Sequence, residues 1–191
     1  ARMQFQNAQT QLVADMALLD SRMKYVLWIG LCPASDTTLI EALKDEGVSV
    51  AFVEAYEPNA DHIRRLELGA VAHMTIRDYL GDPDPCVENG LPPEFDLIVW
   101  QHGPQTMSED ELWPMLPRLQ ERAGVALVMQ MPMGSFKKEY PVNPFDVHRS
   151  VLFPEQFLIR DYEVIPHVCR HERSFTAVKY TQPREDSVCP A

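Results

Sequence analysis

Short apolar segments alternate with helix-like segments along most of this chain, and this alternation limits the fold more than any other feature of the sequence. The apolar segments are nearly continuous, which is typical of strands in a parallel sheet that is buried on both faces. We therefore expect a mostly parallel sheet between two layers of helices. The predicted strands are 25–30, 48–55, 70–76, 95–101 and 125–132, and the predicted helices are 35–47, 57–69 and 108–124.

The end of the chain departs from this rhythm. Residues 161–169 and 174–181 are strand-like, and a short polar turn joins them, as in an antiparallel hairpin. The hairpin extends the sheet to seven strands, so the predicted fold is α/β, a Rossmann-like three-layer αβα sandwich. Right-handed crossovers then place the ligand crevice at the carboxyl ends of the first and fourth strands, where the strand order reverses.

The sequence predicts one domain over residues 1–191, because it contains no internal repeat and no linker-like segment. Before the first strand, Leu12, Met16 and Leu19 recur at helical spacing. This segment lacks the basic flank and apolar block of a signal peptide, so we expect an amphipathic helix packed on the domain. The predicted N-terminal helix, core and tail are residues 1–23, 24–181 and 182–191.

Composition excludes several classes of partner. The net charge is −11 and no basic stripe offsets it, so we expect no nucleic acid to bind. No apolar run approaches the ~20 residues that a membrane-spanning helix needs, so we expect no membrane segment. The four cysteines form no CxxC pair, which favours free thiols in the cytoplasm. The sequence leaves the oligomeric state open.

The loop after the first strand, "GLCPAS" at 30–35, is the first candidate ligand site. A tight turn from a strand into a helix turns backbone N–H groups and the helix N-terminus toward a polar ligand. Glycines usually permit that approach, and here only Gly30 is present, with Cys32 and Ala34 where further glycines are expected. We take Ser35 or Asp36 as the helix N-cap.

Acidic residues follow the second and third strands. Glu54 ends the second strand about 20 residues after the loop, where a carboxylate accepts the ribose hydroxyls of a nucleoside cofactor. A solvent-exposed acid at the end of a strand is an equally good interpretation. Asp78 is placed to accept from an adenine amino group, with Tyr79 beside the ring. The alternative for Asp78, a helix cap or loop acid, is the better supported of the two.

Two later loops carry the candidate catalytic residues. His102, in "WQHGPQ" after the fourth strand, has an ordinary pKa of about 6.5, which suits proton removal near neutral pH. The alternative is a histidine bonded to a nearby carbonyl. The long segment 131–150 carries Tyr140 and His148, and its aromatic and proline content favours an ordered lid over the site.

His167, Cys169 and His171 recur with a period of two, so a regular strand would point all three to one face. Such a set could hold zinc. Packing on an edge strand is the interpretation that we favour, because no second ligand cluster supports a metal. We therefore predict no metal site.

The order of these motifs resembles that of the class I S-adenosylmethionine-dependent methyltransferases over residues 24–181. The resemblance rests on "VLWIGLCPASDT", the acid in "VAFVEAYEP", "FDLIVWQHGP" and the terminal hairpin. The segment after the fifth strand also looks like that of small bacterial members, which carry an Asn-Pro-aromatic motif, a histidine, a serine and an acid-aromatic pair. Here those places are Asn143, Pro144, Phe145, His148, Ser150, Glu155, Phe157 and Tyr162.

The resemblance implies S-adenosylmethionine as cofactor, with Gly30 at its methionine end, Glu54 at the ribose and Asp78 at the adenine. The predicted cofactor site also includes Cys32, Tyr79 and Gln101. The chain departs from the family at Trp28, where an acid is usual, and at the replaced glycines. A Cβ at those loop positions crowds the cofactor or shifts the turn, which puts cofactor affinity in doubt more than the fold.

The resemblance implies methyl transfer to a small-molecule acceptor, with His102 as base or positioning group and Tyr140 and His148 closing over the site. Methyl transfer needs alignment and desolvation above all, so few side chains are obligatory. One alternative is an inactive binding or scaffold protein that has kept the fold. Another is a nicotinamide-dependent oxidoreductase, which the missing GxGxxG and the terminal hairpin disfavour.

Overall fold

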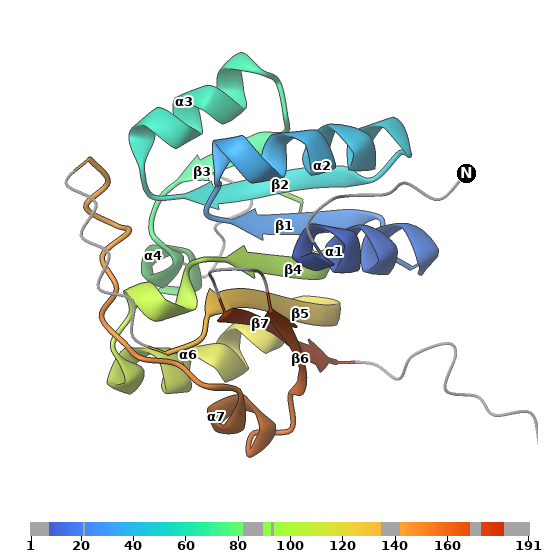
Figure 1. Ribbon diagram of the computed structural model, residues 1–191. Helices are drawn as coiled ribbons and strands as arrows, with labels where there is room; N and C mark the ends of the chain where they lie inside the picture. The colour runs from blue at the N-terminus through green and yellow to red at the C-terminus, as the bar shows by residue number, and fades with distance from the viewer. Residues whose placement is uncertain are drawn as a thin grey trace, which may run out of the picture.

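A seven-stranded sheet organises the molecule (Figure 1). The computed structural model describes residues 8–20, 22–81, 90–92, 94–134, 142–168 and 173–181. Strands β1 to β5 pair in parallel, and β7 runs antiparallel to both of its neighbours. The predicted mixed sheet with a terminal hairpin is therefore confirmed. In spatial order the strands are β3 (Ala70–His73), β2 (Ser49–Glu54), β1 (Tyr25–Ile29), β4 (Phe95–Gln101), β5 (Ala123–Pro132), β7 (Arg173–Tyr180) and β6 (Glu163–Val168).

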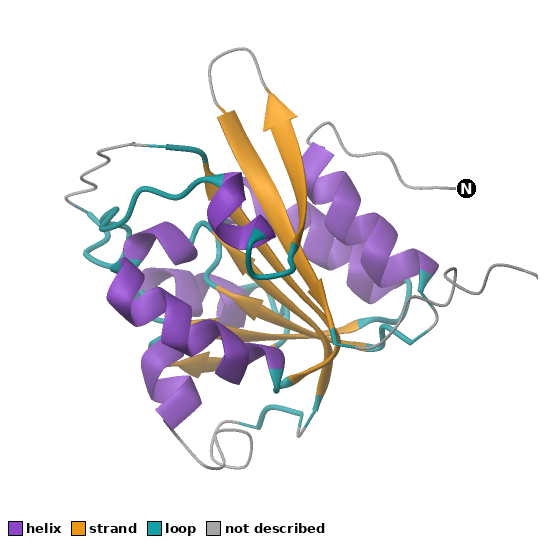
Figure 2. Cartoon of the chain, turned by 90° about the horizontal axis from the view of Figure 1, so that it is seen from below, coloured by secondary structure: helices purple, strands orange, loops and turns teal. Residues whose placement is uncertain are grey.

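Helices cover both faces of the sheet, as the sequence predicts (Figure 2). Apolar side chains of α1, α2 and α3 share one core with one face of the sheet, and those of α4, α6 and α7 share the other. Within the described ranges, no helix is both long enough and apolar enough to cross a membrane. The helices are α1 (Ala8–Leu19), α2 (Pro33–Asp45), α3 (Glu57–Arg65), α4 (Ile76–Gly81), α6 (Glu109–Gln120) and α7 (Pro154–Leu158).

The N-terminal helix packs on the domain as expected. The buried side chains of α1 include Val13, Met16 and Ala17, which join the core shared with α2 and the sheet. Leu12 is partly buried against the same core. The helix covers Ala8–Leu19 of the predicted segment 1–23, and residues 1–7 and 21 lie outside the described residues.

Several element boundaries differ from the predicted ones. Helix α2 begins at Pro33, with Cys32 as its N-cap, so the prediction of Ser35 or Asp36 as N-cap was wrong. Proline suits the first helical position because its fixed φ is helical and no partner is needed for an N–H there. Strand β3 ends at His73, and a short helix that the sequence analysis did not predict, α4, follows it. Helix α6 continues through Pro114 and Pro117.

Tyr162 anchors the hairpin end of the sheet to α6 and α7. The ring is buried and meets Phe157 edge to face, with centroids 5.6 Å apart. The amide of Gln120 donates to its hydroxyl oxygen. Burial raises the pKa of Tyr162 to about 12, and the bond from Gln120 only partly opposes that rise.

This raised pKa predicts alkaline instability. In the unfolded chain the phenol ionises near its ordinary pKa of 10.0, before the folded phenol does. The stability that Tyr162 contributes is therefore present below pH 10 and is lost as the pH rises toward 12. We expect Tyr162→Phe to lose less unfolding free energy than the wild type between pH 9.5 and 11, measured by urea denaturation. Parallel losses in the two proteins would contradict this prediction.

Candidate functional site

The candidate site lies at the carboxyl edge of the sheet, where β1 is flanked by β2 and β4. This is the point at which the strand order reverses, and open α/β sheets bind their ligands there. The chain leaves β1 through Gly30, whose φ of +70° suits glycine. The N–H of Gly30 donates to Val53 O at 2.9 Å, so the turn stays close to the end of β2.

Glu54, the last residue of β2, holds this turn with its side chain. One carboxylate oxygen accepts from the N–H of Leu31 at 2.8 Å, and the other accepts from the N–H of Tyr56 at 2.8 Å. The residue is 4 % exposed, so it is not the solvent-exposed acid that we weighed as the alternative. Glu54 thus connects the ends of two adjacent strands.

Asn59, in the first turn of α3, reinforces the same contact. Its side-chain nitrogen donates to Leu31 O at 2.9 Å and lies 3.4 Å from a carboxylate oxygen of Glu54. Burial raises the pKa of Glu54, and the N–H groups of Tyr56 and Leu31 partly oppose the rise. The sequence analysis missed Asn59. Its only signal was a polar side chain in the helix turn that follows the acid.

A second carboxylate holds the next residue of the loop. Asp36, which is 1 % exposed, accepts from the N–H of Cys32 at 2.8 Å. With the Gln101 amide oriented so that its nitrogen faces Asp36, that nitrogen lies 2.7 and 3.1 Å from the two carboxylate oxygens. Asp36 was expected only as a helix cap, and Gln101 as a cofactor ligand. The structure brings both side chains together beneath the loop.

The buried polar contacts continue across the sheet. The oxygen of Gln101 then lies 2.6 Å from the side-chain oxygen of Gln130 on β5, so the two amides form a hydrogen bond only when that of Gln130 is turned as well. The strand neighbour of Gln130 is Thr176 on β7. The hydroxyl of Thr176 lies 2.8 Å from Nε2 of His167. Burial lowers the pKa of His167. Of the three residues weighed as a metal set, Cys169 and His171 lie outside the described residues.

The turn after β4 places His102 at the same edge. Its backbone is left-handed, with φ of +49°, and its N–H donates to Gln130 O at 2.8 Å. The side chain is exposed. Gly103 follows directly against Trp100, and a Cβ built on Gly103 would lie 1.6 Å from the indole nitrogen. The left-handed backbone of His102 is costly for a residue other than glycine, and such strained residues cluster at functional sites.

The segment after β5 contributes His148, which is half-buried. Its Nε2 lies 3.5 Å from the side-chain nitrogen of Gln105, in the 3₁₀ turn η1 (Pro104–Thr106). The structure therefore brings His148 to the turn that carries His102. Tyr140, the third predicted catalytic residue, lies outside the described residues.

The side chains of Asp78 and Tyr79, which we predicted as an adenine-binding pair, lie in different surroundings. Asp78 is exposed in the first turn of α4 and accepts from the hydroxyl of Thr75 at 2.7 Å. Tyr79 is only 1 % exposed, and the guanidinium of Arg122 lies 4.7 Å from its ring centroid. Tyr79 is therefore a core residue, and Asp78 has the helix-terminal position that we weighed as its alternative.

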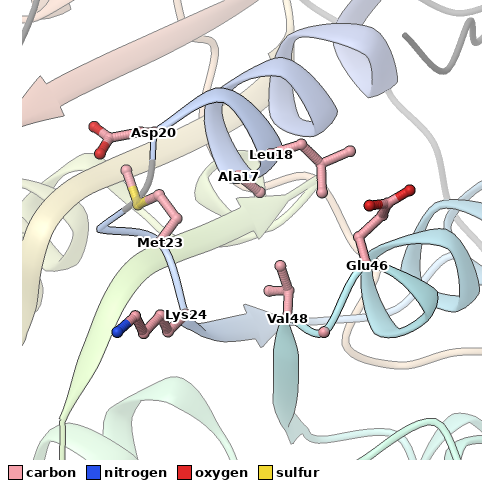
Figure 3. A pocket seen from close by; sticks show the side chains of 8 residues that line it. Ala17, Leu18, Asp20, Met23, Lys24, Glu46 and Val48 are labelled. Carbon is pink, nitrogen blue, oxygen red and sulfur yellow. The ribbon is translucent and has the colours of Figure 1, made fainter. Parts of the chain in front are cut away.

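A hollow of about 250 Å³ lies at the opposite end of β1, where α1 and α2 end (Figure 3). Its lining includes apolar side chains from α1 and charged groups at its rim, among them Lys24 and Glu46. None of the predicted site residues that the structure describes lines this hollow.

Comparison with known proteins gives the fold a family context. No family model matches this sequence, and no curated protein matches it either. Among solved structures, an S-adenosylmethionine-dependent methyltransferase from Archaeoglobus fulgidus is similar over 90 % of this chain and 92 % of its own, at 14 % identity and a TM-score of 0.62. The 1,6-didemethyltoxoflavin-N1-methyltransferase of Burkholderia thailandensis, solved with S-adenosylhomocysteine, is similar over 92 % and 79 %, at 16 % identity and a TM-score of 0.58. The CurJ carbon methyltransferase is similar over 90 % of this chain and 53 % of its own, at 14 % identity and a TM-score of 0.58.

The chain has the class I methyltransferase fold. The resemblance found in the sequence is thereby confirmed at the level of the fold. Within this fold, the place on β1 where an acid is usual holds Trp28, which is fully buried in the core with α2. The carboxylates that hold the loop after β1 here are those of Glu54 on β2 and Asp36 on α2.

The contact between Gly103 and Trp100 predicts that Gly103→Ala is destabilising. The new methyl group has no room unless the turn or the indole moves, and such overpacking costs about 1–3 kcal/mol. Gly81→Ala is the matched control, because a Cβ on Gly81 would meet nothing within 4 Å. Urea denaturation of both variants measures the difference. Equal stabilities would show that the turn adapts without cost.

Proposed function

We propose that this chain binds S-adenosylmethionine at the carboxyl ends of β1 and β2 and transfers the methyl group to a small-molecule acceptor. The observation that carries the proposal is the buried Glu54 carboxylate at the end of β2, in contact with the loop after β1. A carboxylate in that place accepts hydroxyl groups of a ribose. The methyltransferase fold of the chain supports this assignment.

The residues present fit the nucleoside part of this cofactor. A carboxylate has about four acceptor positions, and the N–H groups of Leu31, Tyr56 and Asn59 occupy three of them. The Asn59 contact is the longest at 3.4 Å, so a ribose hydroxyl displaces it most easily. A hydroxyl donor also offsets the burial that raises the pKa of Glu54.

The other candidate residues have complementary roles in this proposal. S-adenosylmethionine supplies an activated methyl group, so the protein has to align an acceptor and exclude water. Gly30 gives the loop its turn without a side chain at the methionine end. Asp78 remains a candidate for the adenine amino group, and its exposure leaves it accessible. Tyr79 is left out of the proposed site because it is a core residue.

His102 and His148 are the proposed groups on the acceptor side. Both lie at the carboxyl edge, His102 exposed after β4 and His148 half-buried after β5. An imidazole accepts a proton near neutral pH, and a protonated nucleophile would require such a base. In the proposal, His102 is the base or positioning group and His148 closes over the acceptor together with Tyr140.

A specific observation favours a second candidate function, a binding or scaffold protein without turnover. The amides of Leu31 and Cys32 are those that a cofactor loop would offer to its ligand, and here Glu54 and Asp36 already accept from them. A loop that is satisfied by its own side chains gains less from a ligand. In either case we propose a cytoplasmic protein, as the sequence analysis expects from four cysteines that form no CxxC pair.

Calorimetric titration with S-adenosylhomocysteine tests the proposal. We expect micromolar binding by the wild type and about 10- to 100-fold weaker binding by Glu54→Ala, because a charged acceptor for ribose hydroxyls is lost. Glu54→Gln, which keeps the shape of the side chain, should fall between the two. Substitution of an exposed acid on α2, Glu41→Ala, is the matched control and should bind like the wild type.

Two outcomes separate the candidate functions. Unchanged affinity in Glu54→Ala would refute the assignment of the ribose site. Absence of heat with S-adenosylhomocysteine and with S-adenosylmethionine, in a folded wild-type protein, would favour the scaffold function.

A further inference from the structure

Two buried polar atoms beside His148 have no hydrogen-bond partner in the part of the chain that the structure describes. They are the side-chain oxygen of Gln105 and the hydroxyl of Ser150. Gln105 as a whole is 2 % exposed. Buried polar groups in native proteins are paired with few exceptions, because an unpaired one loses its hydrogen bonds to water without replacement. Two such atoms on neighbouring segments therefore need a polar partner that the described part of the chain does not supply.

The rest of Gln105 is held firmly, which fixes where its free oxygen lies. Its side-chain nitrogen donates to His102 O at 2.8 Å, and its backbone oxygen accepts from the N–H groups of Arg149 and Ser150 at 2.8 and 3.2 Å. Gln105 therefore ties the turn after β4 to the segment after β5. Its side chain cannot exchange oxygen and nitrogen without losing the bond to His102.

His148 completes one wall of this subsite. The side-chain nitrogen of Gln105, which can only donate, lies 3.5 Å from Nε2 of His148. Ser150 has no hydrogen bond to hold its hydroxyl in one rotamer. It can therefore turn toward a ligand without breaking a bond.

We propose that Gln105 and Ser150 form the binding subsite for the acceptor. The name "acceptor" for the ligand rests on the proposed methyl transfer, whereas the binding of a ligand at these two residues does not depend on it. The side-chain oxygen of Gln105 requires a donor from the ligand, and the hydroxyl of Ser150 supplies a donor to it. The subsite takes a neutral group that presents an N–H or O–H donor next to a carbonyl or hydroxyl acceptor. A carboxylate is disfavoured, because it would place a negative charge against the Gln105 oxygen in a buried site.

The probe that tests the subsite is 2-pyridone, which carries an N–H and a carbonyl on adjacent atoms, and its control is N-methyl-2-pyridone, which lacks the donor. Binding is followed through the side-chain NH₂ signals of Gln105 in ¹H–¹⁵N spectra, assigned by their absence in Gln105→Met. We expect 2-pyridone to bind with a millimolar Kd and the N-methyl compound about tenfold more weakly. Equal affinities, or no binding of 2-pyridone, would overturn the proposal.

Variants link this discrimination to the two residues. Gln105→Met and Ser150→Ala should each weaken 2-pyridone binding by about five- to tenfold, while Gln11→Met on α1 should leave it unchanged. Ser150→Ala should also keep or raise the unfolding temperature, because it removes a buried hydroxyl without a partner. Wild-type affinity in either site variant, or a lowered unfolding temperature in Ser150→Ala, would count against the subsite.

Titration of the same proteins with S-adenosylhomocysteine keeps the two proposals distinguishable. If the wild type binds 2-pyridone as expected but not S-adenosylhomocysteine, the subsite stands and methyl transfer fails. If S-adenosylhomocysteine binds and 2-pyridone is not distinguished from its N-methyl analogue, the subsite alone fails.

Discussion

The candidate site depends on two buried carboxylates that accept from consecutive amides of one loop. Glu54 holds the N–H of Leu31 and Asp36 holds the N–H of Cys32, each at 2.8 Å. Hydrogen bonds to a charged acceptor are roughly twice as strong as neutral ones, and burial strengthens them further. These two bonds fix the conformation of a loop that lacks the glycines usual at this place.

The arrangement accounts for Trp28 within the methyltransferase fold. An acid at that position of β1 would face the core that β1 shares with α2, which here is filled with apolar side chains. The indole adds to that core, and the carboxylate that supports the loop comes from the first turn of α2 instead. A change on the strand is thus compatible with an ordered loop, because a different element supplies the charge.

The sequence was sufficient to predict the layers, the strands, and a parallel sheet that ends in an antiparallel hairpin. These features follow from apolar segments that alternate with helices and from the turn near the end of the chain. It was also sufficient to place Glu54 and His102, since the ends of parallel strands meet at one edge. It could not reveal the role of Asp36, because a buried carboxylate and a helix cap look alike in a sequence. Gln105 and Asn59 were missed for a related reason: their functions depend on contacts with segments that are distant in the chain, Gln105 with residues 148–150 and Asn59 with Leu31. Tyr79 illustrates the opposite error, since an aromatic residue beside a motif acid was read as a ligand and packs instead under Arg122.

Gln130 on β5 connects the two halves of the site. Its backbone oxygen accepts from the N–H of His102, which fixes the turn after β4. Its side chain meets Gln101, whose amide contacts Asp36 beneath the loop after β1. A movement of either loop therefore has to be accommodated by a buried network in which every broken bond leaves an unpaired polar group. The network favours a carboxyl edge that is organised before any ligand arrives, which lowers the ordering cost of binding and suits the proposed methyl transfer, whose main requirement is alignment.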